Sequence, residues 1–102
     1  MIMERVTFRE SKLLKERGFI QDTIGSMWYD EDGTLLRFKP KSKSWIAPTY
    51  YEVWEWLASK GIFIDVDYSA MQWVADYEDK LFSGATQEKA LKECINYIIR
   101  EE

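Results

Sequence analysis

The stretch from Pro48 to Tyr68 reads PTYYEVWEWLASKGIFIDVDY and contains the clearest helix signal and the clearest strand signal of the chain. Thr49 and Glu52 have the spacing of a capping box, in which each side chain bonds the other residue's backbone amide. The apolar residues that follow recur with a helical period, and Gly61 offers the left-handed residue that commonly ends a helix. These apolar residues are Tyr50, Val53, Trp54, Leu57 and Ala58. We therefore predict a helix over residues 49–60.

After the glycine the apolar residues alternate, which is typical of a strand. In the segment 62–68, one face carries Ile62, Ile64, Val66 and Tyr68, and the other carries Phe63, Asp65 and Asp67. An apolar face must be covered, so we expect the helix 49–60 to pack against this strand and against a later helix. The predicted core contacts join Val53, Trp54 and Leu57 to Ile64, Val66, Leu91, Ile95 and Ile98.

Two more helices and two hairpins complete the predicted fold. Thr7 and Glu10 form a second capping box before a helix near 7–17, and Thr86 is the expected N-cap of a helix near 86–100. Apolar runs on both sides of Asp30-Glu31-Asp32-Gly33 predict one hairpin, and the alternation over 71–77 predicts a partner for the strand 62–68. The expected class is α+β, ordered helix-hairpin-helix-hairpin-helix around a small, mainly antiparallel sheet.

Composition indicates a folded domain. The 102 residues, 46% hydrophobic and 31% charged, predict a single α+β domain over residues 1–102. Fourteen Lys and Arg against 18 Asp and Glu give a net charge of −4, which argues against nucleic acid or an anionic membrane as the partner of the whole molecule. The lone Cys94 and the absence of a signal-peptide pattern or an apolar membrane span predict a cytoplasmic protein without a membrane partner.

Four segments, taken together, resemble a known family. They read TFRESKLLKERGF (7–19), YDEDGTL (29–35), IAPTYYEVWEWLASKGIFIDV (46–66) and ATQEKALKECINYIIR (85–100). They are similar to a family of small uncharacterised proteins from Bacteroides-group gut bacteria and their phages and prophages. The resemblance implies an α+β fold and a phage-related origin, and it carries no activity, cofactor or site residue. The family would lead us to expect a more acidic start to the last helix than TQEKAL.

The residue types argue against catalysis. The chain contains no histidine, which removes the commonest general base and the usual zinc sites. Cys94 falls in the apolar stripe of the last predicted helix, where we expect it to pack in the core. A calcium loop through Asp30–Gly33 would need its first and twelfth ligands at Trp28 and Lys39, and neither is a carboxylate. We therefore predict no enzyme activity and no cofactor.

Three carboxylates form the remaining candidate for a metal. Asp65 and Asp67 share a strand face, and Asp76 is expected on the partner strand, where the three can gather around a divalent cation. A solvated strand face is the more usual reading of such a pattern, so we assign no metal.

Two hypotheses for function remain. The first is a protein-binding accessory factor without catalytic activity, whose partner is another protein or a second copy in a homodimer; Trp56, at the margin of the apolar helix face, is the expected anchor. The alternative is a nucleic-acid-associated phage factor that uses the segment 37–45. In that alternative Arg37, Lys39, Lys41 and Lys43 contact phosphates and Trp45 stacks on a base.

Overall fold

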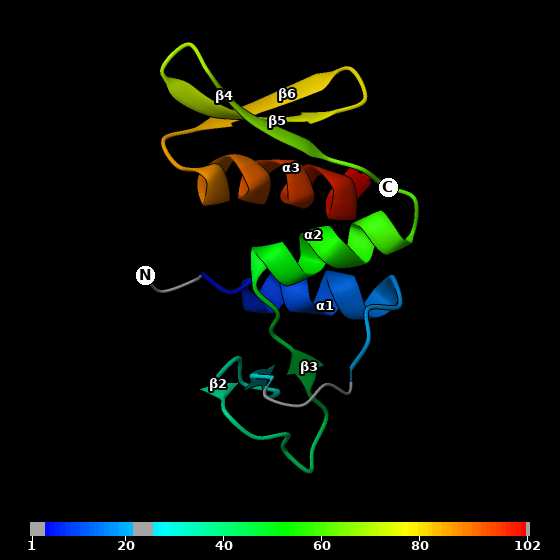
Figure 1. Ribbon diagram of the computed structural model, residues 1–102. Coiled ribbons are helices and arrows are strands. Elements are labelled where there is room, and N and C mark those ends of the chain that lie inside the picture. Colours follow the sequence, from blue (N-terminus) through cyan, green and yellow to red (C-terminus); the bar gives the residue numbers. More distant parts are fainter. Residues whose placement is uncertain (1–3, 22–25, 102) are drawn as a thin grey trace. The chain divides into compact units, whose positions relative to one another are not determined.

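The computed structural model describes residues 4–21 and 26–101 (Figure 1). Over these ranges the chain forms three helices and two three-stranded antiparallel sheets, which confirms the α+β class. The chain divides into two compact units, Met1–Thr49 and Tyr50–Glu102. None of the helices in the described ranges combines the length and the apolar character that crossing a bilayer demands. The single domain over 1–102 stays a prediction.

The three helices lie close to their predicted bounds. They are α1 (Phe8–Glu16), α2 (Tyr50–Ser59) and α3 (Gln87–Glu101). The capping box of α1 is formed: the Glu10 amide donates to Thr7 Oγ1 at 3.2 Å, and the Thr7 amide donates to Glu10 Oε1 at 2.7 Å. Thr86 caps α3, since its Oγ1 accepts the Lys89 amide at 3.1 Å. Local capping chemistry thus sets where these two helices begin.

Gly61 ends α2 as predicted. It has a φ of 83°, in the left-handed region that glycine adopts without a steric penalty. Its amide donates to the Ala58 carbonyl at 3.0 Å, and the Ile62 amide donates to the Leu57 carbonyl at 2.9 Å. This pair of bonds is a Schellman motif, which satisfies two carbonyls that the helix end leaves free.

The first unit contains α1 and a sheet in the order β2-β1-β3. The strands are β1 (Trp28–Tyr29), β2 (Leu35–Leu36) and β3 (Trp45–Ile46). The predicted hairpin β1–β2 is confirmed, and its turn is held by Asp30 Oδ1, which accepts the amides of Asp32 and Thr34, each at 2.9 Å. Strand β3, which pairs antiparallel with β1, was not predicted. A strand of two residues is too short to show the alternation of apolar and polar residues by which strands are predicted.

Aromatic rings join α1 to this sheet. The Phe8 ring centroid lies 5.3 Å from that of Trp45, edge to face, and 5.5 Å from that of Tyr29. The Tyr29 hydroxyl donates to the Val6 carbonyl at 2.7 Å. Burial, and next the Glu10 carboxylate, raise the pKa of Tyr29, so this hydroxyl keeps its proton.

The second unit contains α2, α3 and a sheet in the order β4-β5-β6. The strands are β4 (Asp65–Ser69), β5 (Gln72–Tyr77) and β6 (Lys80–Gly84). The predicted pairing of β4 with β5 is confirmed, although β4 begins three residues later than the predicted segment 62–68. Strand β6, which pairs antiparallel with β5, was not predicted. The described residues therefore hold two small sheets in place of the single expected one, each a hairpin with a third strand added.

Helix α3 packs against both the sheet β4-β5-β6 and α2, and so forms the centre of the second unit (Figure 1). The predicted core is confirmed for its buried members: Val53, Leu57, Ile64, Leu91, Ile95 and Ile98. Val66 and Trp54 are only half-buried. Trp54 also contacts the predicted strand segment by a polar bond, because its Nε1 donates to the Ile64 carbonyl at 3.1 Å.

Candidate functional site

The turn between β4 and β5 is backbone-strained and apolar. Ser69 pairs with Gln72, which leaves a two-residue turn made of Ala70 and Met71. Their φ angles are 52° and 64°, a left-handed conformation that non-glycine residues rarely adopt. The Met71 side chain is 90% exposed. A turn of this kind usually contains Asn-Gly, so an exposed methionine here departs from what local stability favours.

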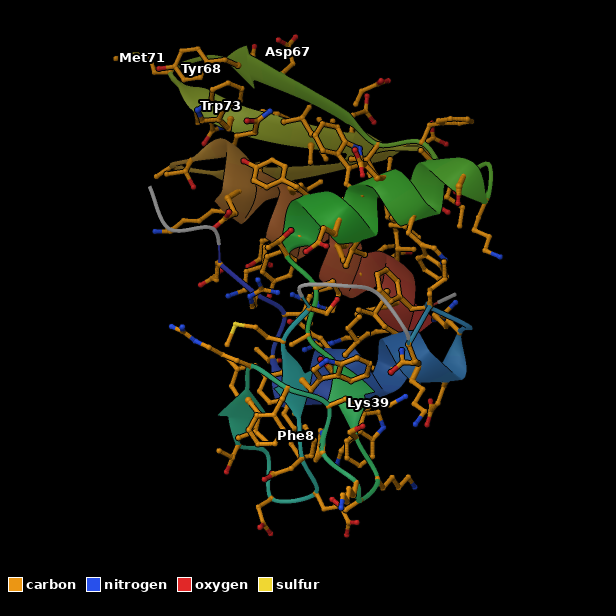
Figure 2. All side chains as sticks on the ribbon, turned by 60° about the horizontal axis from the view of Figure 1, so that its bottom comes forward. Phe8, Lys39, Asp67, Tyr68, Met71 and Trp73 are labelled. Atoms are coloured by element: carbon orange, nitrogen blue, oxygen red, sulfur yellow. The ribbon has the colours of Figure 1, made fainter. Side chains whose placement is uncertain are left out.

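Two aromatic rings lie directly behind this turn. Tyr68 is opposite Trp73 in the register, with ring centroids 5.3 Å apart and edge to face. Tyr68 is 56% exposed and Trp73 is half-buried. Figure 2 shows Tyr68, Met71 and Trp73 gathered at one end of the β4–β5 hairpin. We call Tyr68, Met71 and Trp73 the hairpin tip.

The sequence-predicted anchor Trp56 is half-buried, as its place at the margin of the helix face implied. The Lys60 ammonium lies 5.8 Å from the centroid of its ring system. The same helix carries an open depression of about 450 Å³, lined by Tyr51, Trp54, Glu55 and Ala58. Trp56 does not line this depression. Sequence reasoning missed the depression because it assigned Trp54 to the core.

The predicted basic segment lies in unit 1, between β2 and β3. Arg37, Lys39, Lys41 and Lys43 are all exposed, without regular secondary structure. The Lys39 ammonium lies 5.2 Å from the centroid of the Trp28 ring. Trp45 differs from the four cations, because it is only 9% exposed and packs against Phe8. The stacking of a base on Trp45 stays a prediction, and it would require the side chains around this ring to move.

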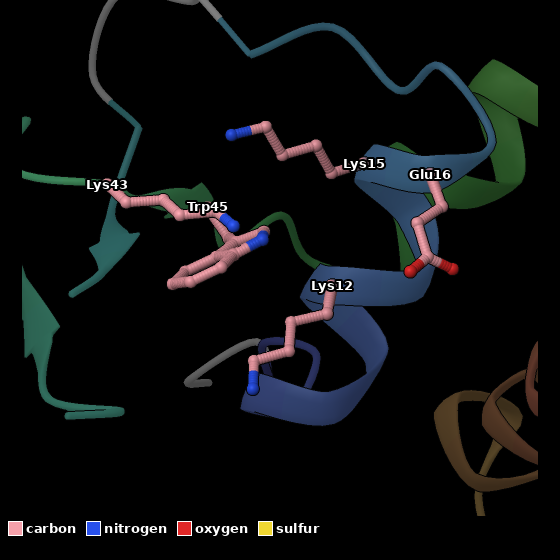
Figure 3. Close-up of a pocket in the computed structure, with 5 residues that line it drawn as sticks. All are labelled: Lys12, Lys15, Glu16, Lys43 and Trp45. Carbon is pink, nitrogen blue, oxygen red and sulfur yellow. The ribbon is translucent and has the colours of Figure 1, made fainter. Parts of the chain in front are cut away.

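Three lysines surround the Trp45 ring. Their ammonium groups lie 5.4 Å (Lys12), 5.6 Å (Lys15) and 5.5 Å (Lys43) from its centroid. Together with Glu16 they line a depression of about 500 Å³ that has Trp45 in its wall (Figure 3). We call this feature the lysine pocket. Lys12 and Lys15, on α1, are far from Lys43 in the sequence. The lysine pocket is therefore visible only in the fold, where β3 pairs with β1 and α1 packs beside β3.

The groups weighed for catalysis and for a metal are Cys94 on α3 and three aspartates on β4 and β5. Cys94 is buried in α3, as predicted, and burial, followed by the Asp76 carboxylate, raises the pKa of its thiol to about 12. Asp65 lies opposite Asp76 in the register, as expected. In the described ranges, however, no three His, Cys, Asp or Glu side chains are grouped closely enough to hold a metal ion, so Asp65, Asp67 and Asp76 do not form the cluster considered above.

Comparison with known proteins finds one similarity in sequence. Over 82 residues the chain is 30% identical to Translation machinery-associated protein 64 of Saccharomyces cerevisiae. The matched part is 80% of this chain and 13% of the yeast protein, so the chain spans only a small part of that relative. No model of a known protein family matches the chain. No solved structure is significantly similar to it.

Proposed function

We propose that this protein is a protein-binding accessory module without turnover of its own, and that the hairpin tip is its main contact. The observation that supports this most is Met71, 90% exposed in a turn where both residues have positive φ. Strained backbone persists where function requires it, and methionine adapts to an apolar partner surface. Trp56, on α2 of the same unit, is the proposed second anchor.

Charge indicates what kind of surface the hairpin tip meets. The unit Tyr50–Glu102 has five Lys and Arg against eleven Asp and Glu, a net charge of −6. Asp67 adjoins the tip, and its Oδ1 accepts the Tyr68 amide at 2.8 Å. A complementary partner therefore has a basic surface around an apolar recess that accepts Met71. Self-association is also part of the proposal, so a second copy of the chain is tested beside basic proteins.

Two resemblances, one to a yeast protein and one to a bacterial and phage family, support the proposal. The yeast protein is, by its name, associated with translation machinery, which fits a module that attaches to a larger assembly. The resemblance to small proteins of Bacteroides-group bacteria and their phages supports a phage-related origin.

The test compares two exposed residues of the hairpin tip with one exposed residue elsewhere in the second unit. Met71→Ser with Tyr68→Ser should abolish self-association in sedimentation and the capture of basic proteins from a Bacteroides-group lysate. Leu81→Ser removes a side chain that is 70% exposed and lies outside the tip, and it should leave both the self-association and the capture unchanged. Trp56→Ala should weaken the association while changing stability by less than about 1 kcal/mol. If the double tip variant associates as the wild type does, the proposal fails.

Nucleic-acid binding through the segment 37–45 is the second candidate. The unit Met1–Thr49 has nine Lys and Arg against seven Asp and Glu, a net charge of +2. This unit is therefore basic, although the net charge of the whole chain is negative. Changing Arg37, Lys39, Lys41 and Lys43 together to Ala should spare protein association under the first proposal. Loss of a salt-sensitive complex with DNA or RNA in this variant, with Trp56→Ala harmless, would favour the second candidate.

A further inference from the structure

Three cations meet in the lysine pocket with little opposing charge. Lys12 and Lys15 are one turn apart on α1, and Lys43 approaches from the residues before β3. Glu16 is the single carboxylate among the residues that line the pocket. Like charges held together repel, so an arrangement with a net charge of about +2 is completed by an anion.

The Trp45 ring explains how the three ammonium groups are held. Each lies within 5.6 Å of its centroid, at the distance of a cation–π contact. Lys12 also lies 4.1 Å from the Phe8 centroid, and the Lys15 ammonium donates to the Ser44 carbonyl at 3.1 Å. Each of the three lysines is thus held near the Trp45 ring, and Lys12 and Lys15 have a further contact that orders them.

The chemistry of the pocket indicates the ligand. Ammonium groups act as compact point charges toward phosphate oxygens, with no preference for a base. Trp45 is 9% exposed beneath them, so little of its ring is available to a base. The volume of about 500 Å³ admits one or two phosphate groups with the sugar that joins them.

We propose that the lysine pocket binds the phosphate groups of an anionic ligand, in the first instance the phosphodiester backbone of a single-stranded nucleic acid, without base specificity. The site is independent of protein binding by the hairpin tip. For the nucleic-acid candidate, this proposal assigns the phosphate contacts to Lys12, Lys15 and Lys43. Of these, Lys12 and Lys15 lie outside the segment 37–45.

The experiment measures anisotropy of a fluorescent oligouridine about 12 nucleotides long, titrated at salt concentrations from about 20 to about 200 mM. Changing Lys12, Lys15 and Lys43 together to Gln should weaken binding at least about tenfold and lower the salt slope by about 2, the value for three lost contacts to a single strand. Changing the same three to Arg keeps the charge and should restore most of the affinity. Circular dichroism confirms that each variant is folded.

A matched control removes the same charge elsewhere. Changing Lys60, Lys80 and Lys89, all exposed in the second unit, to Gln should lower affinity less than about threefold. Equal losses in the two triple variants, or no binding by the wild type at the lowest salt, would overturn the proposal. Competition by inorganic phosphate or glycerol phosphate below about 1 mM would identify a small phosphate ester as the ligand in place of the polymer. The tip variants should bind the oligonucleotide as the wild type does, so the two proposals can fail separately.

Discussion

Leu57 and Ser59 are two residues apart on α2 but have opposite environments. Leu57 is 2% exposed and packs in the core of the second unit, whereas Ser59 is exposed and its hydroxyl donates only to the Trp56 carbonyl. We expect Leu57→Ala to lower the free energy of unfolding by about 2–5 kcal/mol, because it removes buried apolar contacts and leaves a cavity. Ser59→Ala should change it by less than about 0.5 kcal/mol. Urea denaturation measures both, and equal midpoints would contradict the core assignment.

The buried thiol of Cys94 predicts a dependence on pH. Its pKa is raised from about 9.0 to about 12, so between these values the native state keeps a proton that the unfolded chain has released. The stabilising contribution is therefore complete below about pH 9 and is lost as the pH rises toward 12, at up to about 1.4 kcal/mol per pH unit.

Cys94→Ala isolates this contribution from other titrations. The stability difference between wild type and Cys94→Ala should stay constant from about pH 7 to 8.5 and then shift against the wild type as the pH rises further. Denaturation at a series of pH values gives the two curves. Parallel curves up to about pH 11 would show that the thiol is not protected from ionisation.

At the scale of elements, the backbone conformation of the β4–β5 turn lowers the stability of the protein. Ala70 and Met71 both have positive φ, so Ala70→Asn with Met71→Gly, the residues this turn favours, should raise the free energy of unfolding by about 1 kcal/mol or more. The same variant removes the exposed methionine and should lose the proposed protein contact. Denaturation and sedimentation measure the two effects.

The other hairpin of this sheet supplies the control. Glu78, between β5 and β6, has a φ of 55°, so Glu78→Asn relieves similar strain without touching the hairpin tip. It should stabilise the protein and preserve association. If Ala70→Asn with Met71→Gly stabilises the protein and binding is also preserved, the strained turn has no part in recognition.

At the scale of the whole molecule, the two units are short. Met1–Thr49 and Tyr50–Glu102 each fall near or below the size at which a single core commonly suffices for stability. We therefore expect the predicted single domain to unfold in one transition. Fluorine NMR of labelled tryptophans follows both units during urea denaturation, since Trp28 and Trp45 belong to the first and the other three to the second. Separate midpoints for the two groups would show two domains.

Features that depend on a few neighbouring residues could be predicted from the sequence. The capping box of Thr7 and Glu10 and the cap at Thr86 act within one helical turn. The end of α2 is equally local, because the Gly61 amide bonds to Ala58 and the Ile62 amide bonds to Leu57. The hairpin turn at Asp30 is equally local. The amphipathic faces also predicted the buried residues Tyr50, Val53 and Leu57 of α2 and Leu91, Ile95 and Ile98 of α3. The prediction was wrong for Ala58, which is exposed.

Strand β3 and the lysine pocket were decided by tertiary structure. Strand β3 has two residues, so it is a strand only because β1, which lies before β2 in the chain, pairs with it. Strand β6 was also not predicted, although its partner β5 is only two residues away in the chain. Lys12 and Lys43 are separated by 30 residues of chain, and α1 and β3 bring them to one ring. By itself the sequence determined the class, the helices and the first hairpin, because their signals are local. The addition of β3 and the convergence of charge depend on contacts between distant segments, which no short-range pattern encodes.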